Sequence, residues 1–401
     1  MRILFYNHTG QVSGAERVLL LVLARLNRGY FRPEVICPAA GQLKKGVDEL
    51  GVPCHEVDGL EARFTGRIDH LVRYLGSFCR LVGQVRAQVI RLGPDLVHAN
   101  SVRAGLVSTA ATIGLDIPVV WHVHDMLPRH PLSTAIRLVV LCSRRTRIVA
   151  ISKAVAQSFR GTILRTTKAY AGAIILNAVD SERFHPDPTS RPRARQELNL
   201  DDADQVIGIV GQLTPRKGQL ELLEAFALVL QQLPRATLVV VGAPLFNQDE
   251  DYLRRLEHSV ETFGIGERVR FLGARHDIAP IMGALDLLVV NSLVEPFGLV
   301  VLEGMACGTP VLATAVDGIP EIITHGEDGW LVPPRNASRL ASAIVQLISQ
   351  PKLRAGLSAL ALERVSSQFT AERYMRELQA FYEQSQRQGL RSENKQLAIE
   401  S

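Results

Sequence analysis

The sequence lacks several features that mark other classes of protein. Aromatic residues make up 5% of it, and no Lys/Arg block with interleaved aromatic residues occurs, so nucleic acid is not an expected partner. The five cysteines show neither CxxC nor Cys/His spacing, which indicates a reduced chain without a metal centre. Since GxxxxGK(S/T) and GxGxxG are both missing, neither a P-loop nucleotidase nor a dinucleotide-dependent dehydrogenase is favoured.

Membrane insertion is not expected either. No stretch of eighteen apolar residues occurs, and the apolar run after Met1 is too short for a signal peptide. We therefore expect a cytoplasmic protein that is either soluble or peripheral at the inner face of the membrane.

What the chain does have is a charge asymmetry. The part before His185 carries 24 basic and 13 acidic residues, whereas the remainder carries 21 basic and 27 acidic residues. A basic first half indicates an anionic partner for that half alone, such as a phospholipid surface or a phosphate-bearing substrate.

Short apolar runs alternate with longer segments of helical period, which predicts parallel sheets covered by helices. A Pro-rich polar segment near 180–195 divides the chain and is typical of an exposed linker. The expected domains are 1–185 and 186–368, then a C-terminal helix over 369–388 and a flexible tail over 389–401. Strands are predicted at 2–6, 34–37, 95–98, 118–122, 147–151, 173–176, 206–211, 237–242, 269–273, 286–290 and 310–314.

One helix is predicted over 67–91, where apolar residues, Leu75 among them, recur every three or four positions. Arg73, Arg80 and Arg91 fall on another face of this helix. That basic face is either solvated or in contact with anionic lipid head groups.

Two segments that follow predicted strands carry groups suited to a ligand, because ligands of α/β sheets bind at the carboxyl ends of strands. GQLTPRKG places Arg216 and Lys217 at a helix start, which suits a diphosphate or is simply a solvated helix start. EPFGLVVLEG places Glu295 before a helix and Glu303 within it, with the amides of Gly298 and Leu299 between them. Two carboxylates beside an anion-binding helix end suit a nucleotide-sugar, although Glu303 could merely offset the helix dipole.

A third segment, PVVWHVHDM, delivers His124 to the carboxyl end of a predicted strand, while His122 is taken as structural. A single histidine there is either a structural residue or part of the site. The adjacent Asp125 favours the second interpretation.

These segments together resemble retaining family-4 glycosyltransferases of the GT-B fold. Glu295 and Glu303 form the Glu-x7-Glu pair of the family's donor signature, and GQLTPRKG, VAISKAV and SGAERVLL resemble further family motifs. The likeness runs from about residue 3 to residue 384. It implies two Rossmann-like α/β domains facing across a cleft, with a C-terminal helix that returns to the first domain.

The resemblance also implies roles for individual residues. Glu303 would hold the ribose hydroxyls and Glu295 those of the donor sugar. Lys217 would bind the diphosphate, and His124 the donor sugar or its phosphate. The remaining candidate donor contacts are Ser13, Gly14, Arg275, Phe297, Gly298, Leu299 and Val300.

Two positions depart from the family pattern. Gln212 stands where the family usually has an Arg, and we expect Arg216 to supply part of the missing positive charge. Ser13 stands where the family usually has a Gly, whereas Gly14 matches the second glycine of the family's loop.

The implied activity is transfer of a hexosyl-type sugar from a nucleotide-diphosphate sugar to an acceptor hydroxyl with retained configuration, in cell-surface glycan, glycolipid or polysaccharide synthesis. The acceptor would be a glycan, a lipid-linked molecule or a small metabolite. Neither a cofactor nor a metal is expected, since the sugar nucleotide is a co-substrate. The alternatives are a GT-B-like nucleotide-sugar epimerase and a non-catalytic nucleotide-sugar binding protein.

Overall fold

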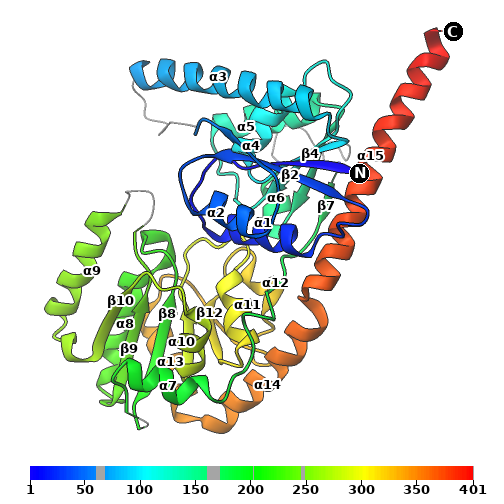
Figure 1. Cartoon of the computed structure of the whole chain (residues 1–401). Coiled ribbons are helices and arrows are strands. Elements are labelled where there is room, and N and C mark those ends of the chain that lie inside the picture. Colours follow the sequence, from blue (N-terminus) through cyan, green and yellow to red (C-terminus); the bar gives the residue numbers. More distant parts are fainter. Residues whose placement is uncertain (60–67, 160–171, 202, 245–248, 401) are drawn as a thin grey trace. The chain divides into compact units, whose positions relative to one another are not determined.

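The computed structural model describes residues 1–59, 68–159, 172–201, 203–244 and 249–400. The chain forms two compact α/β units (Figure 1). The first unit comprises Met1–Asn177 together with Ala371–Ser401, and the second comprises Ala178–Thr370.

The first unit is built on a seven-stranded parallel sheet in the order β3-β2-β1-β4-β5-β6-β7. Its strands are β1 Arg2–Tyr6, β2 Arg32–Pro38, β3 Cys54–Val57, β4 Leu96–Ala99, β5 Val119–Val123, β6 Thr146–Ala150 and β7 Gly172–Ile174. Its helices are α1 Gly14–Arg25, α2 Gln42–Glu49, α3 Ile68–Leu92, α4 Val102–Ala111, α5 Pro131–Cys142, α6 Lys153–Phe159 and α15 Ala371–Glu400.

The second unit is built on a six-stranded parallel sheet in the order β10-β9-β8-β11-β12-β13. Its strands are β8 Gln205–Val210, β9 Ala236–Val241, β10 Val269–Gly273, β11 Leu287–Val290, β12 Val311–Thr314 and β13 Trp330–Val332. Its α-helices are α7 Ser190–Glu197, α8 Gln219–Leu230, α9 Glu250–Thr262, α10 Ile278–Ala284, α11 Leu299–Ala306, α12 Ile319–Ile322, α13 Ala337–Ser349 and α14 Pro351–Gln368.

The prediction of two Rossmann-like α/β units is confirmed, and every predicted strand overlaps an observed one. The strands read as apolar runs because parallel strands are covered on both faces; all residues of β9, β11 and β12 are buried. Strands β3 and β13 were not predicted; only one residue of each is buried.

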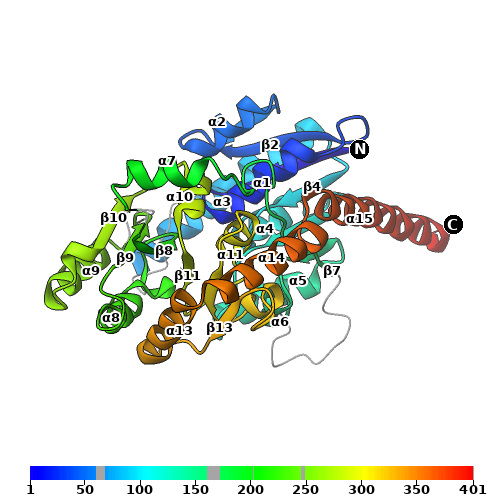
Figure 2. The same cartoon turned by 90° about the horizontal axis from the view of Figure 1, so that it is seen from below.

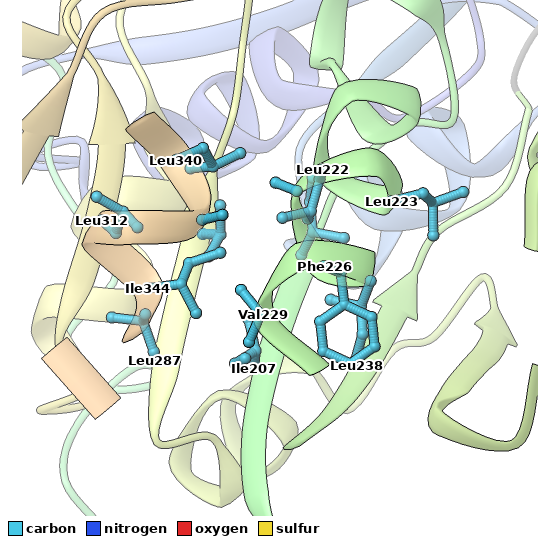
Figure 3. Packing of buried hydrophobic residues seen from close by; sticks show 14 of the residues in the cluster. Ile207, Leu222, Leu223, Phe226, Val229, Leu238, Leu287, Leu312, Leu340 and Ile344 are labelled. Carbon is cyan, nitrogen blue, oxygen red and sulfur yellow. The ribbon is translucent and has the colours of Figure 1, made fainter. Parts of the chain in front are cut away.

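Helices α8 and α13 lie side by side over the second sheet (Figure 2). Leu222, Phe226 and Val229 of α8 recur at helical spacing and are fully buried. They face Leu340 and Ile344 of α13 across the apolar core (Figure 3). This core covers one face of the sheet, and the loops at the carboxyl ends of the strands carry the polar groups.

Helix α15 packs on the first unit, although it follows the second in sequence. Tyr382 lies edge-on to Phe5 of β1, and its hydroxyl is 2.8 Å from Nδ1 of His98 on β4. The hydroxyl of Tyr374 is 3.4 Å from Nε2 of His122 on β5. Both tyrosines are fully buried, so α15 completes the core of the first unit.

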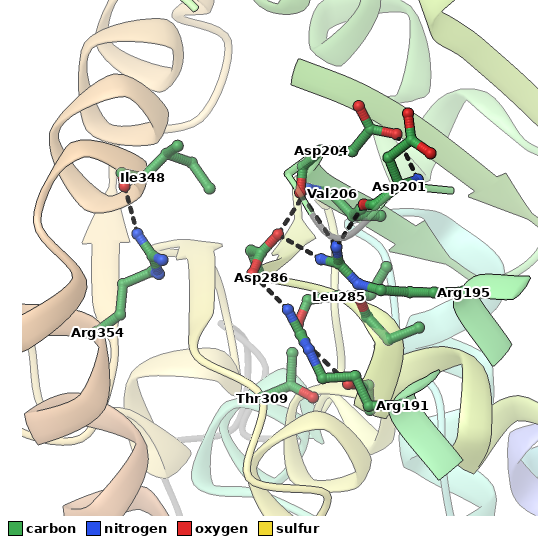
Figure 4. A network of polar contacts seen from close by, with 12 residues as sticks. Arg191, Arg195, Asp201, Asp204, Val206, Leu285, Asp286, Thr309, Ile348 and Arg354 are labelled. Atoms are coloured by element: carbon green, nitrogen blue, oxygen red, sulfur yellow. Dashed lines mark hydrogen bonds and ion pairs between the residues drawn. The ribbon is translucent and has the colours of Figure 1, made fainter. Parts of the chain in front are cut away.

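The segment predicted as an exposed linker over 180–195 runs into a helix, α7, that its sequence pattern did not predict. Arg195 of α7 is 3% exposed, and its Nη2 lies 2.8 Å from Oδ2 of Asp286 (Figure 4). Arg191 reaches Oδ1 of the same carboxylate at 2.7 Å. The buried residues of α7 are Ala194 and Arg195, so the helix has no apolar stripe from which hydrophobic periodicity could have predicted it.

Helix α3 confirms the predicted helix, but Leu75 is 52% exposed rather than in the core. The buried stripe consists of Leu81, Val85, Val89 and Leu92. Arg73, Arg80 and Arg91 are exposed, as predicted. In the described part of the chain, no helix has both the length and the apolar character needed to cross a bilayer.

Candidate functional site

Lys217 and Glu295 meet at the carboxyl end of the second sheet. Lys217 ends a short 3-10 turn, Pro215–Lys217, that follows β8, and Glu295 lies in the loop that follows β11. These strands are neighbours at the point where the strand order reverses, which is where α/β sheets bind ligands. Nζ of Lys217 lies 2.5 Å from Oε2 of Glu295, and the side chains are 16% and 10% exposed.

The loop that carries Glu295 is fixed by its neighbours. Oε2 of Glu295 also accepts a hydrogen bond from the Ser292 hydroxyl at 2.9 Å. Its backbone N–H donates to Oδ2 of Asp317 at 2.9 Å, and its carbonyl accepts from the N–H of Gly318 at 3.1 Å. The carboxylate is therefore held in place before a ligand arrives.

Gly218 allows the two loops to approach closely. Its φ is 67°, and a Cβ at this position would lie 2.1 Å from the carbonyl oxygen of Asn291. The Asn291 amide donates to the Gly218 carbonyl at 2.8 Å, and the N–H of Leu293 donates to the Arg216 carbonyl at 2.7 Å. Only glycine combines this left-handed backbone with this approach.

Helix α11 begins at the site. Its N-cap, Gly298, has a φ of 111°, and the N–H of Val301 already donates to the Gly298 carbonyl at 3.0 Å. The amides of Leu299 and Val300 therefore lie at the open end of the helix, where donors have no intrahelical partner. No acidic residue stands in the first turn, so the positive end of the helix dipole is not offset there. Glu303 follows on the same helix and is 6% exposed, and Phe297 is 2% exposed.

The other predicted residues of the second unit are arranged differently. The side chain of Arg216 is exposed beside Lys217. The backbone carbonyl of Gln212 accepts a hydrogen bond from the side-chain amide of Gln219 at 2.9 Å. The guanidinium of Arg275 is engaged by Asp277, with Nε–Oδ1 at 2.8 Å and Nη2–Oδ2 at 2.5 Å, so its charge is largely satisfied within the loop.

Three predicted residues lie in the first unit, also at the carboxyl ends of strands. Ser13 is the N-cap of α1 and Gly14 its first residue. Both the N–H and the hydroxyl of Ser13 donate to Oε2 of Glu16, at 3.0 and 2.6 Å. His124 directly follows β5 and is 8% exposed, and burial lowers the pKa of its imidazole to about 3.

The sequence did not single out Asn7, Asn100, Ser292 and Asp317, which connect the predicted residues to the scaffold. Asn7 and Asn100 each directly follow a strand. That position was the available signal, because polar residues after parallel strands gather at one edge of the sheet.

With this geometry established, comparison with known proteins identifies the family. Two family models match, "Glycosyl transferases group 1" over residues 190–364 and "Glycosyltransferase Family 4" over residues 12–183. The crystal structure of HepE from Anabaena in complex with UDP-glucose is 30% identical, with a TM-score of 0.82, over 95% of this chain and 98% of that one.

Curated relatives agree. A D-inositol 3-phosphate glycosyltransferase from Stackebrandtia nassauensis is 31% identical over 68% of this chain, and the matched segment spans 64% of that protein's length. A lipopolysaccharide core biosynthesis mannosyltransferase from Rhizobium meliloti is 29% identical over 66% of this chain and 79% of its own. These relatives favour a transferase over the epimerase and the non-catalytic binding protein. The resemblance seen in the sequence is thus confirmed: the chain belongs to the family-4 glycosyltransferases of the GT-B fold.

Proposed function

We propose that this protein transfers a hexosyl-type sugar from a UDP-sugar to an acceptor hydroxyl with retention of configuration. The observation that carries the proposal is the partly buried Lys217–Glu295 pair at the N-terminus of α11, with Glu303 following on that helix. UDP is the proposed nucleotide because HepE, the structural relative, was solved with UDP-glucose.

In this proposal the donor lies along the carboxyl end of the second sheet. Glu303 accepts hydrogen bonds from the ribose hydroxyls, and Glu295 accepts them from the donor sugar. The amides between Phe297 and Val300 face the diphosphate, and Lys217 supplies a cation beside it. The 2.5 Å ion pair places cation and carboxylate together, as a diphosphate attached to a polyhydroxylated ring requires.

The proposed chemistry is mainly electrostatic. Breaking the sugar–phosphate bond builds negative charge on the leaving diphosphate, and Lys217, Arg216 and the open end of α11 would stabilise that charge. Lys217 and the helix are already fixed, so they need no rearrangement at the moment of reaction. Glu295 binds sugar hydroxyls rather than attacking the ring, and the leaving phosphate helps to deprotonate the acceptor. No step requires a metal or a cofactor.

The proposed acceptor site lies in the basic first unit. We propose a glycan, lipid-linked or small-molecule acceptor, in the synthesis of a cell-surface polysaccharide or glycolipid. The exposed Arg73 and Arg80 of α3, beside the 52% exposed Leu75, support contact with an anionic membrane surface. The location proposed with it is cytoplasmic, peripheral at the inner face of the membrane.

A thermal-shift panel tests the donor assignment. UDP-glucose, GDP-mannose and ADP-glucose are compared at equal concentration, and a UDP-sugar is expected to raise the melting temperature most, because ligand binding stabilises the native state. Glu303→Ala should abolish that shift. Glu224→Ala, which removes an exposed carboxylate on α8, is the matched control and should retain it. A panel in which no sugar nucleotide raises the melting temperature would refute the proposal.

A further inference from the structure

The hydrogen bonds around His124 form a chain in which the donor and the acceptor of each bond can be assigned. Nε2 of His124 lies 3.3 Å from Oδ1 of Asn100, and the three residues that continue the chain are buried: Asn100 and Asn7 are 0% exposed and Glu16 is 3% exposed. An imidazole carries its proton on either nitrogen, and an amide can point either way. The far end of the chain decides between these options.

At the Asn7 end of the chain, the neighbouring groups can only accept hydrogen bonds. The Nδ2 of Asn7 lies 2.6 Å from the Thr9 carbonyl and 3.2 Å from Oε1 of Glu16. Oε2 of Glu16 accepts from both the N–H and the hydroxyl of Ser13, so the carboxylate is an acceptor. Asn7 must therefore direct its NH₂ group toward them and its Oδ1 away.

Asn100 is oriented in turn. Its Nδ2 donates to Oδ1 of Asn7 at 3.0 Å and to the Ala15 carbonyl at 3.3 Å. A backbone carbonyl cannot donate, so the NH₂ group of Asn100 faces α1 and its Oδ1 faces the histidine. Since Oδ1 only accepts, Nε2 of His124 must carry a proton.

The other ring nitrogen then holds a lone pair. Burial lowers the pKa of His124 to about 3, so the ring carries a single proton at neutral pH. Within the described residues, no hydrogen bond reaches Nδ1 of His124. The titratable groups nearby are His98, His122, Tyr374, Tyr382, Glu16 and the adjacent Asp125.

We infer that Asn100 is a positioning residue which, held by Asn7 and Glu16, fixes His124 as an uncharged ring with its proton on Nε2 and presents Nδ1 as an acceptor to a substrate hydroxyl. The inference rests on the proposed function in that the hydroxyl belongs to the sugar donor or the acceptor. It narrows the role of His124, because a neutral ring that presents a lone pair cannot bind a phosphate oxygen. His124 therefore accepts a hydrogen bond from a sugar hydroxyl and contributes no positive charge to the binding of the diphosphate.

The first experiment locates the proton in the ligand-free chain. Two-bond ¹H–¹⁵N spectra of the ¹⁵N-histidine-labelled protein distinguish the two tautomers, and the spectrum of His124→Gln assigns the signal. Nε2-protonated His124 from pH 6 to 8 supports the inference, whereas Nδ1-protonated or doubly protonated His124 overturns it. In Asn100→Ala both tautomers should be populated, and an unchanged tautomer would refute the role of Asn100.

The second experiment compares two replacements of His124. The Oδ1 of Asn occupies the place of Nδ1, whereas the amide of Gln reaches the place of Nε2. His124→Asn should therefore retain at least tenfold more kcat/KM than His124→Gln. Equal losses, or a better Gln variant, would overturn the role of Nδ1.

Asn100→Asp adds a pH readout. A carboxylate beside Nε2–H favours the imidazolium, which cannot accept a hydrogen bond at Nδ1, so the acid limb of kcat/KM should move toward neutral pH. Asn27→Asp, the same change at an exposed position of the first unit, is the control and should leave the profile unchanged. An acid limb that stays in place in Asn100→Asp counts against the inference. The tautomer of His124 is measured without ligand. A result that overturns this inference is therefore distinguishable from a thermal-shift panel in which no sugar nucleotide binds.

Discussion

At the scale of single residues, the charge on Lys217 is more constrained than that on Arg216. Lys217 is 16% exposed on its side chain and bonded to Glu295, whereas Arg216 is exposed. A cation fixed in a partly desolvated place interacts more strongly with an anion than one that moves in water. The two basic residues of one turn should therefore contribute unequally to donor binding.

Titration calorimetry with a UDP-sugar would test this difference. Lys217→Ala should weaken binding roughly 10- to 100-fold, since hydrogen bonds to charged groups contribute about 1.5–3 kcal/mol. Arg216→Ala should weaken it less than Lys217→Ala, but measurably, if Arg216 compensates for Gln212. Lys352→Ala, at an exposed site on α14, is the control. Unchanged affinity in Arg216→Ala would show that the charge missing at Gln212 is not replaced by Arg216.

Gly218 offers a second test at this scale, because the chain contains a matched glycine. Gly218 and Gly264 have φ values of 67° and 66°, but a Cβ on Gly264 meets nothing within 4 Å. Gly264→Ala should cost about 1–2 kcal/mol of stability, the strain of the left-handed backbone alone. Gly218→Ala should cost clearly more and also weaken donor binding, because the β11 loop must move away from the new methyl group. Equal costs in urea unfolding would contradict the close approach.

At the scale of elements, helix α7 is connected to Asp286 by two arginines. Asp286 receives Arg191 and Arg195, and it also accepts from the N–H of Val206 at 2.8 Å. Asp286 directly precedes β11, whereas Glu295 follows that strand, so the two carboxylates lie at opposite ends of β11. The network is therefore separate from the candidate site.

Asp286→Ala should lower the stability of the second unit by about 3–5 kcal/mol, because the buried Arg195 would lose its carboxylate partner. Calorimetry of the full chain measures this loss. Arg254→Ala, which breaks an exposed pair with Asp251, should change stability by less than about 1 kcal/mol. A loss in Asp286→Ala as small as in this control would mean that α7 is held by other contacts.

The elements also show what a sequence can predict. The strands were found because burial on both faces leaves an unbroken apolar run, as in β9. Helix α7 was missed because it has no apolar stripe, and its ion pair with Asp286 joins residues 91 positions apart, which leaves no local pattern. Lys217 and Glu295 were found by their motifs, but their direct contact spans 78 positions and depends on β8 pairing with β11. Asn7 and Asn100 were missed for the same reason, since their bond joins strands β1 and β4.

At the scale of the whole molecule, the two units differ in how they respond to acid. His98, His122 and His124 are buried in the first unit, and burial lowers the pKa of His98 and His124 to about 3 and that of His122 well below 6.5. The histidines of the second unit, His185, His258, His276 and His325, are all exposed. Below pH 6.5 the unfolded first unit binds protons that its folded form excludes, so its stability falls as the pH falls.

Calorimetric scans between pH 7.5 and 5 should therefore show the first unit losing stability faster than the second. Each buried histidine contributes a slope of up to about 1.4 kcal/mol per pH unit between pH 6.5 and its folded pKa. His122→Leu should reduce the slope, and His258→Gln, at an exposed position, should not. Parallel losses in both units would contradict the assignment to the buried histidines.

The position of α15 bears on how the chain is made. A ribosome synthesises the whole second unit before it reaches Tyr374 and Tyr382, the side chains that close over His98 and His122. The domain begun first must wait for its final layer, while the domain begun later can fold as soon as it emerges. While the second unit is synthesised, nascent chains of this protein therefore lack the layer that covers His98 and His122, a state in which chaperone engagement is expected.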